Sequence, residues 1–124
     1  MASILSIETA TSACSVALHI DGELIFAKNK LQEKSHSEYM MQMAQDVLKA
    51  SKIKPNELNA VAISGGPGSY TGLRIGVSSA KGLCFALNIP LIAVNTLEVI
   101  MNQASSINGI DYLCPMLDAR RMEV

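Results

Sequence analysis

The sequence predicts a single α/β domain built on a mixed β-sheet with helices on its faces. Two observations predict this class: three strand-like segments follow one another at the start, and apolar runs then alternate with segments of helical periodicity. The resulting order is βββαβαβαβ. Strands separated by a helix are expected to be parallel, whereas the first three are expected to be antiparallel.

The first three strands are predicted at residues 4–7, 14–20 and 23–28. The first is an apolar run that ends at Glu8, and the second alternates apolar with small or polar residues, which is typical of a strand with one buried face. Asp21-Gly22 separates the second strand from the third. This dipeptide favours a two-residue hairpin turn because both positions tolerate a positive φ.

The remaining elements follow from periodicity and from capping residues. Ser35 and Glu38 fit a capping box for a helix over residues 36–51, and Pro55 suits the first turn of a short helix near 56–58. Ser69 or Thr71 is predicted to cap a helix over 71–87. The other predicted elements are strands at 60–64, 91–94 and 112–117, a C-terminal cap at Asn88, and a helix over 96–105 capped by Thr96.

Residues 118–124 have the composition of a turn followed by a new strand. Nothing in the sequence supplies a partner for that strand, so we expect the chain to be part of a longer protein.

Composition excludes several function classes. Hydrophobic residues make up 49% and charged residues 17%, so a core can be buried, and the net charge of −1 does not suit a stand-alone nucleic-acid-binding domain. The first residues lack the basic region of a signal peptide, and no segment reaches the length of a membrane span. Cys14, Cys84 and Cys114 form no CxxC pair, which favours reduced thiols and a cytoplasmic location.

The glycine-rich segment ISGGPGSYTGLRIG, residues 63–76, joins a predicted strand to a predicted helix. The P-loop pattern fails because no two of the loop glycines at 65, 66, 68 and 72 are five apart and the segment lacks lysine. The dinucleotide pattern GxGxxG fails because Thr71 takes the place of its third glycine. The spacing therefore favours a tight turn whose glycines serve the backbone, and an anion site is the alternative.

Arg74 falls in the first turn of the predicted helix, where the helix dipole disfavours a cation. We therefore expect it to have an anionic partner, which is a carboxylate of this chain or of a partner protein, or an oxyanion of a ligand.

Glu8 is the carboxylate best placed for chemistry, because it ends the first strand beside three hydroxyl residues. Glu8, Thr9, Thr11 and Ser12 form a candidate nucleotide or phosphate loop. The alternative is a strand-end carboxylate that is hydrogen-bonded to the following turn. His19 and His36 are the only histidines and have no ligand-like spacing, so no metal site is predicted.

Met40, Met43 and Val47 recur at helical spacing in the first predicted helix. Such a stripe favours a core face, and a methionine-containing partner surface is the alternative.

Four segments taken together resemble the bacterial TsaB family, which is also called YeaZ and is grouped with the M22 glycoprotease-like proteins. The segments are ILSIETATSACSVAL, HSEYMMQM, ISGGPGSYTGLRIGVSSAKGLCFALNIPL and LDARRMEV, and they cover the chain almost from end to end. The resemblance implies an actin/Hsp70/sugar-kinase (ASKHA, RNase H-like) half-domain with a five-stranded mixed sheet. It also implies that residues 1–108 are the first such domain and that 109–124 open a second.

The resemblance further implies a role in tRNA modification. Proteins of this family are taken to be non-catalytic partners of the paralogous enzyme TsaD, and they act with the ATPase TsaE in threonylcarbamoylation of tRNA adenosine-37. It implies a homodimer when the protein is alone, tRNA contact only within the complex, and no required cofactor, with ATP or ADP as an alternative ligand. The helix face that serves pairing would include Met40, Met43, Val47, Leu73, Arg74 and Val77. A sugar-kinase-like enzyme and a glycoprotease-type metallopeptidase are the alternative functions.

Overall fold

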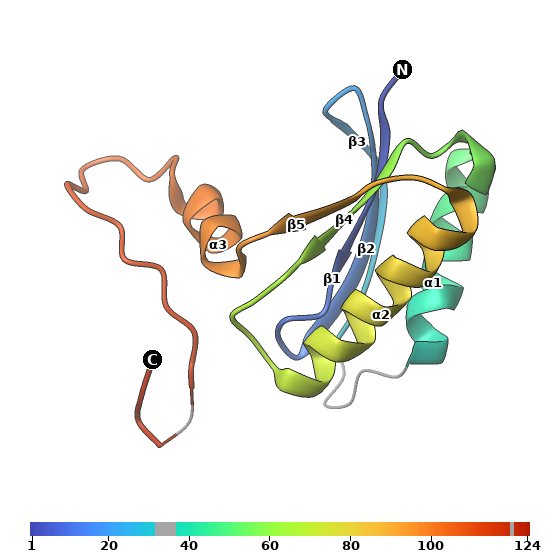
Figure 1. Cartoon of the computed structure of the whole chain (residues 1–124). Helices are drawn as coiled ribbons and strands as arrows, with labels where there is room; N and C mark the ends of the chain where they lie inside the picture. Colours follow the sequence, from blue (N-terminus) through green and yellow to red (C-terminus); the bar gives the residue numbers. More distant parts are fainter. Residues whose placement is uncertain (32–36, 120) are drawn as a thin grey trace.

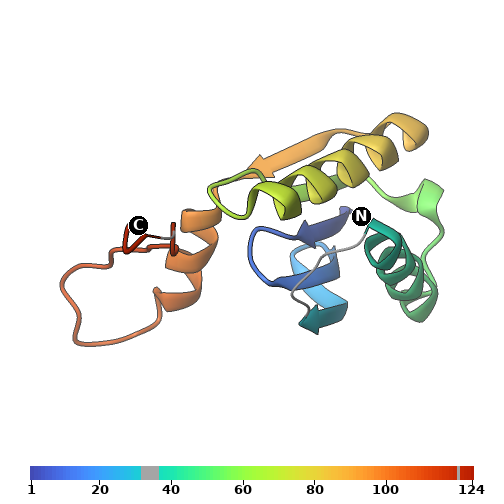
Figure 2. The same ribbon diagram turned by 90° about the horizontal axis from the view of Figure 1, so that it is seen from below.

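The computed structural model describes residues 1–31, 37–119 and 121–124, and shows a five-stranded sheet with two helices on one face (Figures 1 and 2). The strand order is β3-β2-β1-β4-β5. The strands are β1 (Ser3–Glu8), β2 (Ala13–Ile20), β3 (Glu23–Leu31), β4 (Ala60–Ser64) and β5 (Leu91–Val94). The helices are α1 (Ser37–Ser51), the short 3-10 helix η1 (Pro55–Glu57), α2 (Tyr70–Leu87) and α3 (Thr96–Ala104).

The sheet is mixed, as the sequence predicts. β1, β2 and β3 form the antiparallel meander, with Asp21 and Gly22 both at positive φ in the turn between β2 and β3. β4 and β5 continue the sheet in parallel on the other side of β1. The carboxyl ends of β1, β4 and β5 therefore lie at one edge of the sheet, where ligands bind in many α/β proteins.

The core lies between the sheet and the pair of helices α1 and α2. Alternate residues of β1 and β2, among them Leu5, Val16 and Leu18, are fully buried on this face, and Val61 of β4 joins them. α1 packs on β2 and β3, and α2 packs mainly on β4. α3 lies beyond the end of β5, away from α1 and α2 (Figure 1).

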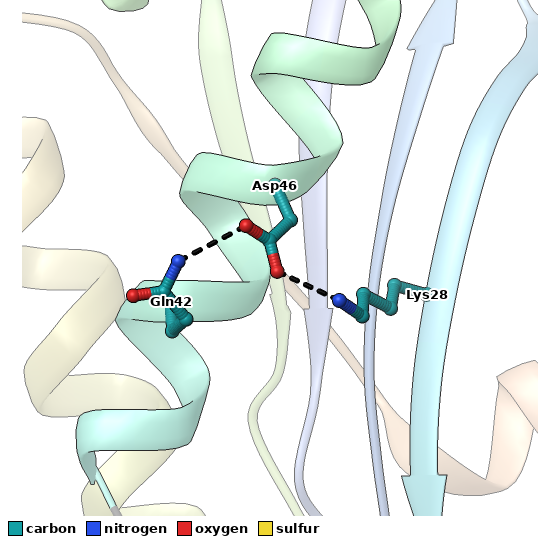
Figure 3. Close-up of polar contacts among 3 residues, drawn as sticks. All are labelled: Lys28, Gln42 and Asp46. Carbon is teal, nitrogen blue, oxygen red and sulfur yellow. Dashed lines mark hydrogen bonds and ion pairs between the residues drawn. The ribbon is translucent and has the colours of Figure 1, made fainter.

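A surface cluster ties β3 to α1 (Figure 3). Lys28 Nζ donates to Asp46 Oδ2 at 2.7 Å, and Gln42 Nε2 donates to Asp46 Oδ1 at 3.0 Å. Both hydrogen bonds, that of Lys28 first, lower the pKa of the Asp46 carboxyl. Because the pair is solvent-exposed, its contribution to stability is small.

The helix ends agree in part with the predicted caps. Ser69 caps α2 through a hydrogen bond from the Gly72 N–H, and Asn88 ends α2 in the left-handed conformation at φ 54°. The cap predicted at Thr96 is wrong by one residue, because Asn95 Oδ1 accepts from the Leu97 N–H at 2.9 Å while Thr96 begins the helix. The predicted capping box of α1 includes Ser35 and the Glu38 side chain, which lie outside the described residues.

The strand predicted at residues 112–117 is also wrong. This segment is extended but has no sheet neighbour, and Tyr112 and Met116 are largely exposed. A strand needs a partner to satisfy its backbone groups, and an apolar run supplies none by itself. Among residues 118–119 and 121–124 there is a turn but no strand.

Candidate functional site: the glycine loop and the outer face of α2

The glycine loop closes the edge of the sheet by hydrogen bonds to two neighbouring segments. The Ser69 N–H donates to the Ala10 carbonyl at 2.7 Å, and the Gly65 N–H donates to the Val94 carbonyl at 2.9 Å. The Gly66 carbonyl in turn accepts from the Thr96 N–H at 3.0 Å. These backbone contacts join the loops that follow β1, β4 and β5 into one layer.

The glycines allow α2 and its entry turn to approach the loop after β1 closely. A Cβ at Gly68 would lie 2.6 Å from the Ala10 carbonyl oxygen, and one at Gly72 would overlap the Thr9 carbonyl oxygen. A Cβ at Gly76 would overlap Thr9 Oγ1 and lie 3.0 Å from Ile63 Cδ1. The expectation that these glycines serve a tight turn and its packing is confirmed.

Gly66 has a different requirement. Its φ of 121° lies in the region that side chains rarely adopt, and a Cβ there would meet only Leu73 Cδ1, at 3.6 Å. Backbone conformation, and not lack of space, therefore calls for glycine at this position.

Glu8 joins the ends of two parallel strands. Its Oε1 accepts from the Ala10 N–H at 2.9 Å, and its Oε2 accepts a hydrogen bond from Ser64 Oγ of β4. The structure thus shows the hydrogen-bonded strand-end carboxylate that was the alternative to a phosphate loop. Both oxygens of the carboxylate are already used within the chain.

The other members of the candidate phosphate loop divide into two groups. Thr9 is fully buried against α2, so its inclusion as a ligand-binding residue is wrong for this conformation. Thr11 and Ser12 are exposed and lie in the turn between β1 and β2. Nucleotide binding at these two residues stays a prediction.

The predicted partner surface needs a similar correction. Met40, Met43 and Val47 have 0%, 4% and 0% of their surface exposed, so they form the core of this chain and present no surface to a partner. They point inward because α1 covers β2 and β3, and the core alternative for this stripe is confirmed. Leu73 and Val77 of α2 are partly buried, and Val77 packs against the core.

Arg74 differs from the other predicted interface residues because it is exposed. Its guanidinium lies 5.4 Å from the centre of the Tyr70 ring, and its Nη1 donates to the Tyr70 hydroxyl at 3.3 Å. Within the described part of the chain, no carboxylate lies at ion-pair distance from Arg74. The expected intrachain carboxylate is therefore not found, and a partner's carboxylate or a ligand anion remains.

Sequence reasoning missed two large exposed residues on the same helix. Tyr70 is 74% exposed and Phe85 is 91% exposed. Steps of four, four, three and four residues place a set of side chains on one face of a helix. We call this set the outer stripe of α2, and its members are Tyr70, Arg74, Ser78, Lys81 and Phe85. The same spacing could have revealed the stripe in the sequence.

The remaining reactive groups do not form a second site. Burial raises the pKa of the Cys14 and Cys84 thiols, which suits inert core residues. Within residues 1–31, 37–119 and 121–124, no three His, Cys, Asp or Glu residues are grouped so as to hold a metal ion. A hollow of about 500 Å³ lies beside α3 and is lined by Val94, Glu98, Val99, Met101, Asn102 and Gln103.

A search for membrane spans in the described part of the chain finds no helix that combines the necessary length with the necessary apolar character.

Comparison with known proteins gives the family. Residues 28–124 match the family model described as TsaD, tRNA N6-adenosine threonylcarbamoyltransferase. The chain belongs to this family. A curated protein from Escherichia coli (strain K12), "tRNA threonylcarbamoyladenosine biosynthesis protein TsaB", is 41% identical over 98% of this chain and 52% of its own length. The protein of the same name from Bacillus subtilis (strain 168) is 35% identical over the same shares of the two chains.

Solved structures agree with this assignment. YeaZ from Pseudomonas aeruginosa is 33% identical and superposes with a TM-score of 0.79 over 84% of this chain and 48% of its own chain. RuvC of Thermus thermophilus, at 12% identity and a TM-score of 0.54, shares the fold alone. The fold is therefore the RNase H-like, ASKHA-type half-domain that the resemblance implies. The chain spans about half the length of the curated relatives it matches.

Proposed function

We propose that this chain belongs to a non-catalytic accessory protein that pairs with a TsaD-like enzyme in the threonylcarbamoylation of tRNA adenosine-37 in the cytoplasm. The observation that carries the proposal is the similarity to TsaB proteins over 98% of the chain, together with the match to the TsaD family model. Two proteins with the same α1–α2 pair could associate through equivalent faces, as symmetric oligomers do. TsaE would act within the same assembly, and tRNA would be contacted only there.

The geometry at the edge of the sheet supports an accessory role. Glu8 stands where a catalytic or metal-bound carboxylate would be expected, and its two oxygens accept hydrogen bonds from Ala10 and Ser64. A group that holds together two strand ends and a turn acts as a structural residue. ATP or ADP binding at the neighbouring Thr11 and Ser12 remains part of the proposal as an alternative and not as a requirement.

The exposed side of α2 supports a role in association. Interfaces are enriched in aromatic residues and arginine, and the outer stripe of α2 carries one aromatic residue at each end with Arg74 between them. We propose this stripe, and not the buried face of α1, as the surface that meets the partner. We also propose that residues 1–108 form the domain that carries it and that 109–124 lead into a second domain.

Reconstitution tests the proposed function. The protein at its native length is mixed with the TsaD and TsaE homologues of the same organism, tRNA and the substrates of the reaction, and the modified nucleoside is measured by mass spectrometry. We expect formation of a complex with the TsaD homologue and strong dependence of the modification on this protein. Full modification in its absence would refute the proposal.

A ligand titration separates the accessory role from a kinase-like one. Isothermal titration with Mg-ATP is carried out on the native-length protein and on Glu8→Ala. We expect no binding that depends on the Glu8 carboxylate. Tight binding that is lost in Glu8→Ala would favour the sugar-kinase-like enzyme.

A further inference from the structure

The outer stripe of α2 has an unbalanced charge. It contains two cations, Arg74 and Lys81, and the sequence of α2 contains neither aspartate nor glutamate. Arg74 lies in the first turn, where the positive end of the helix dipole adds to its own charge. A carboxylate supplied from outside the helix would relieve this arrangement.

Arg74 is held ready for such a partner. The Tyr70 ring lies beside the guanidinium at 5.4 Å, and the Tyr70 hydroxyl accepts one of its five N–H groups. The remaining donors of the exposed guanidinium can form a two-pronged contact with a carboxylate. Because Tyr70 already restricts the arginine side chain, less conformational entropy is lost when the partner binds.

A second copy of this chain offers a poor match for the stripe. If two copies met through equivalent α1–α2 faces, the carboxylates available from these helices would be Glu38 and Asp46. Asp46 is already bound by Lys28 and Gln42. The side chain of Glu38 lies outside the described residues, so its part is settled by experiment below. Two facing α2 stripes would otherwise place cation against cation.

We propose that Arg74 is the charged anchor of the docking face and that it pairs with a carboxylate of a different protein, the TsaD-like partner. The inference rests on the proposed function and adds to it the residue, the chemistry of the contact and the reason for heteromeric pairing. Tyr70 is a positioning residue that acts through Arg74. Phe85 supplies an apolar contact at the other end of the stripe.

The test measures binding of the native-length protein to the TsaD homologue by titration calorimetry. Arg74→Ala should weaken the complex by at least about tenfold, and Arg74→Glu by about a hundredfold. Lys81→Ala removes the same charge from the same stripe and should change affinity by less than about threefold. Arg74→Lys keeps the charge but loses the fork and should be intermediate.

Three further measurements distinguish a specific ion pair from a general field. Raising NaCl from about 0.05 to about 0.5 M should weaken the wild-type complex more than the Arg74→Ala complex. Tyr70→Phe should cost a smaller factor, about two- to threefold, because the arginine is retained. An Asp→Lys or Glu→Lys change on the partner's equivalent helix should restore binding to Arg74→Glu, which would identify the carboxylate.

The outcomes separate this inference from the proposed function. If the wild-type complex forms but Arg74→Ala and Lys81→Ala have equal effects, or neither has any, the inference is overturned and the proposed function stands. If the two wild-type proteins do not associate, both are overturned. If Glu38→Gln abolishes homodimers in sedimentation experiments and Arg74→Glu does the same without affecting the heteromer, Arg74 pairs two copies and the inference is again overturned.

Discussion

Two glycines in the same helix should respond in opposite directions to replacement by alanine. Gly76 and Gly82 both lie in the interior of α2. A Cβ at Gly82 meets nothing within 4 Å, whereas one at Gly76 would overlap Thr9 Oγ1 and lie 3.2 Å from Thr9 Cβ. The pair therefore separates helix propensity from packing within one helix.

The magnitudes follow from these distances. Alanine in place of glycine in a helix interior gains about 0.5–1 kcal/mol, so Gly82→Ala should be stabilising by that amount. Gly76→Ala has the same gain but must displace α2 or Thr9, and overpacking costs about 1–3 kcal/mol. We expect Gly76→Ala to be net destabilising by about 1–2 kcal/mol. The two variants should therefore differ by about 2–3 kcal/mol in the free energy of unfolding.

Urea denaturation followed by circular dichroism measures this difference, and a second substitution locates its cause. Thr9 Oγ1 is buried and makes no hydrogen bond to any described residue, so Thr9→Ala removes the obstructing atom without leaving a partner unpaired. In a double-mutant cycle, Thr9→Ala should recover part of the stability lost in Gly76→Ala. It should not rescue Gly72→Ala, because the obstruction there is the Thr9 main-chain carbonyl oxygen. Equal stabilisation by Gly76→Ala and Gly82→Ala would refute the packing argument.

Three further predictions test the core, the strand-end carboxylate and the surface cluster. Met40→Lys should prevent folding, because it buries an unpaired charge at a fully buried position, whereas Met41→Lys at a 37% exposed position should leave the thermal melt nearly unchanged; similar melts would contradict the burial assigned to α1. Glu8→Gln should destabilise the domain by about 1–3 kcal/mol in urea denaturation, because its hydrogen bonds from Ala10 and Ser64 are then made to a weaker, neutral acceptor; a neutral effect would argue against its structural role. Asp46→Asn should lower stability only above pH 3.8, the ordinary pKa of the group, because the lowered pKa of the folded state gives a contribution that disappears as pH falls through it; a difference that persists in acid melts would contradict this assignment.

Most of the fold could be predicted from local signals. The Asp21-Gly22 turn, the alternation of β2 and the helical spacing in α2 each depend on neighbours in the sequence, and the structure has all three. The strand expected at 112–117 could not be judged in this way, since a strand depends on a partner that lies elsewhere in the chain or outside it. Apolar composition indicates that a segment prefers burial, but it does not supply the neighbour.

The candidate site was predicted less completely than the fold. The sequence placed Arg74 correctly on the surface of a helix, but it could not show whether the stripe of Met40 and Met43 faces the sheet or a partner. That choice depends on which side of the sheet α1 covers. The part of the glycines was recognised as a backbone requirement, whereas the identity of the opposing group, Thr9, needed three dimensions because more than sixty residues separate it from Gly72.

The two faces of α2 are connected by the geometry of the helix itself. Gly72 and Gly76 are four residues apart and face Thr9, and Arg74 lies midway between them in sequence. Two residues correspond to about 200° around the helix axis, so the residue that follows a buried glycine by two points directly outward. Close packing of the glycines fixes the depth of the first turns of α2 against the sheet, and it thereby fixes how far Arg74 and Tyr70 project. The glycine-rich segment resembles a phosphate loop in composition, but in this fold its glycines set the position of a cation on the opposite side of the helix.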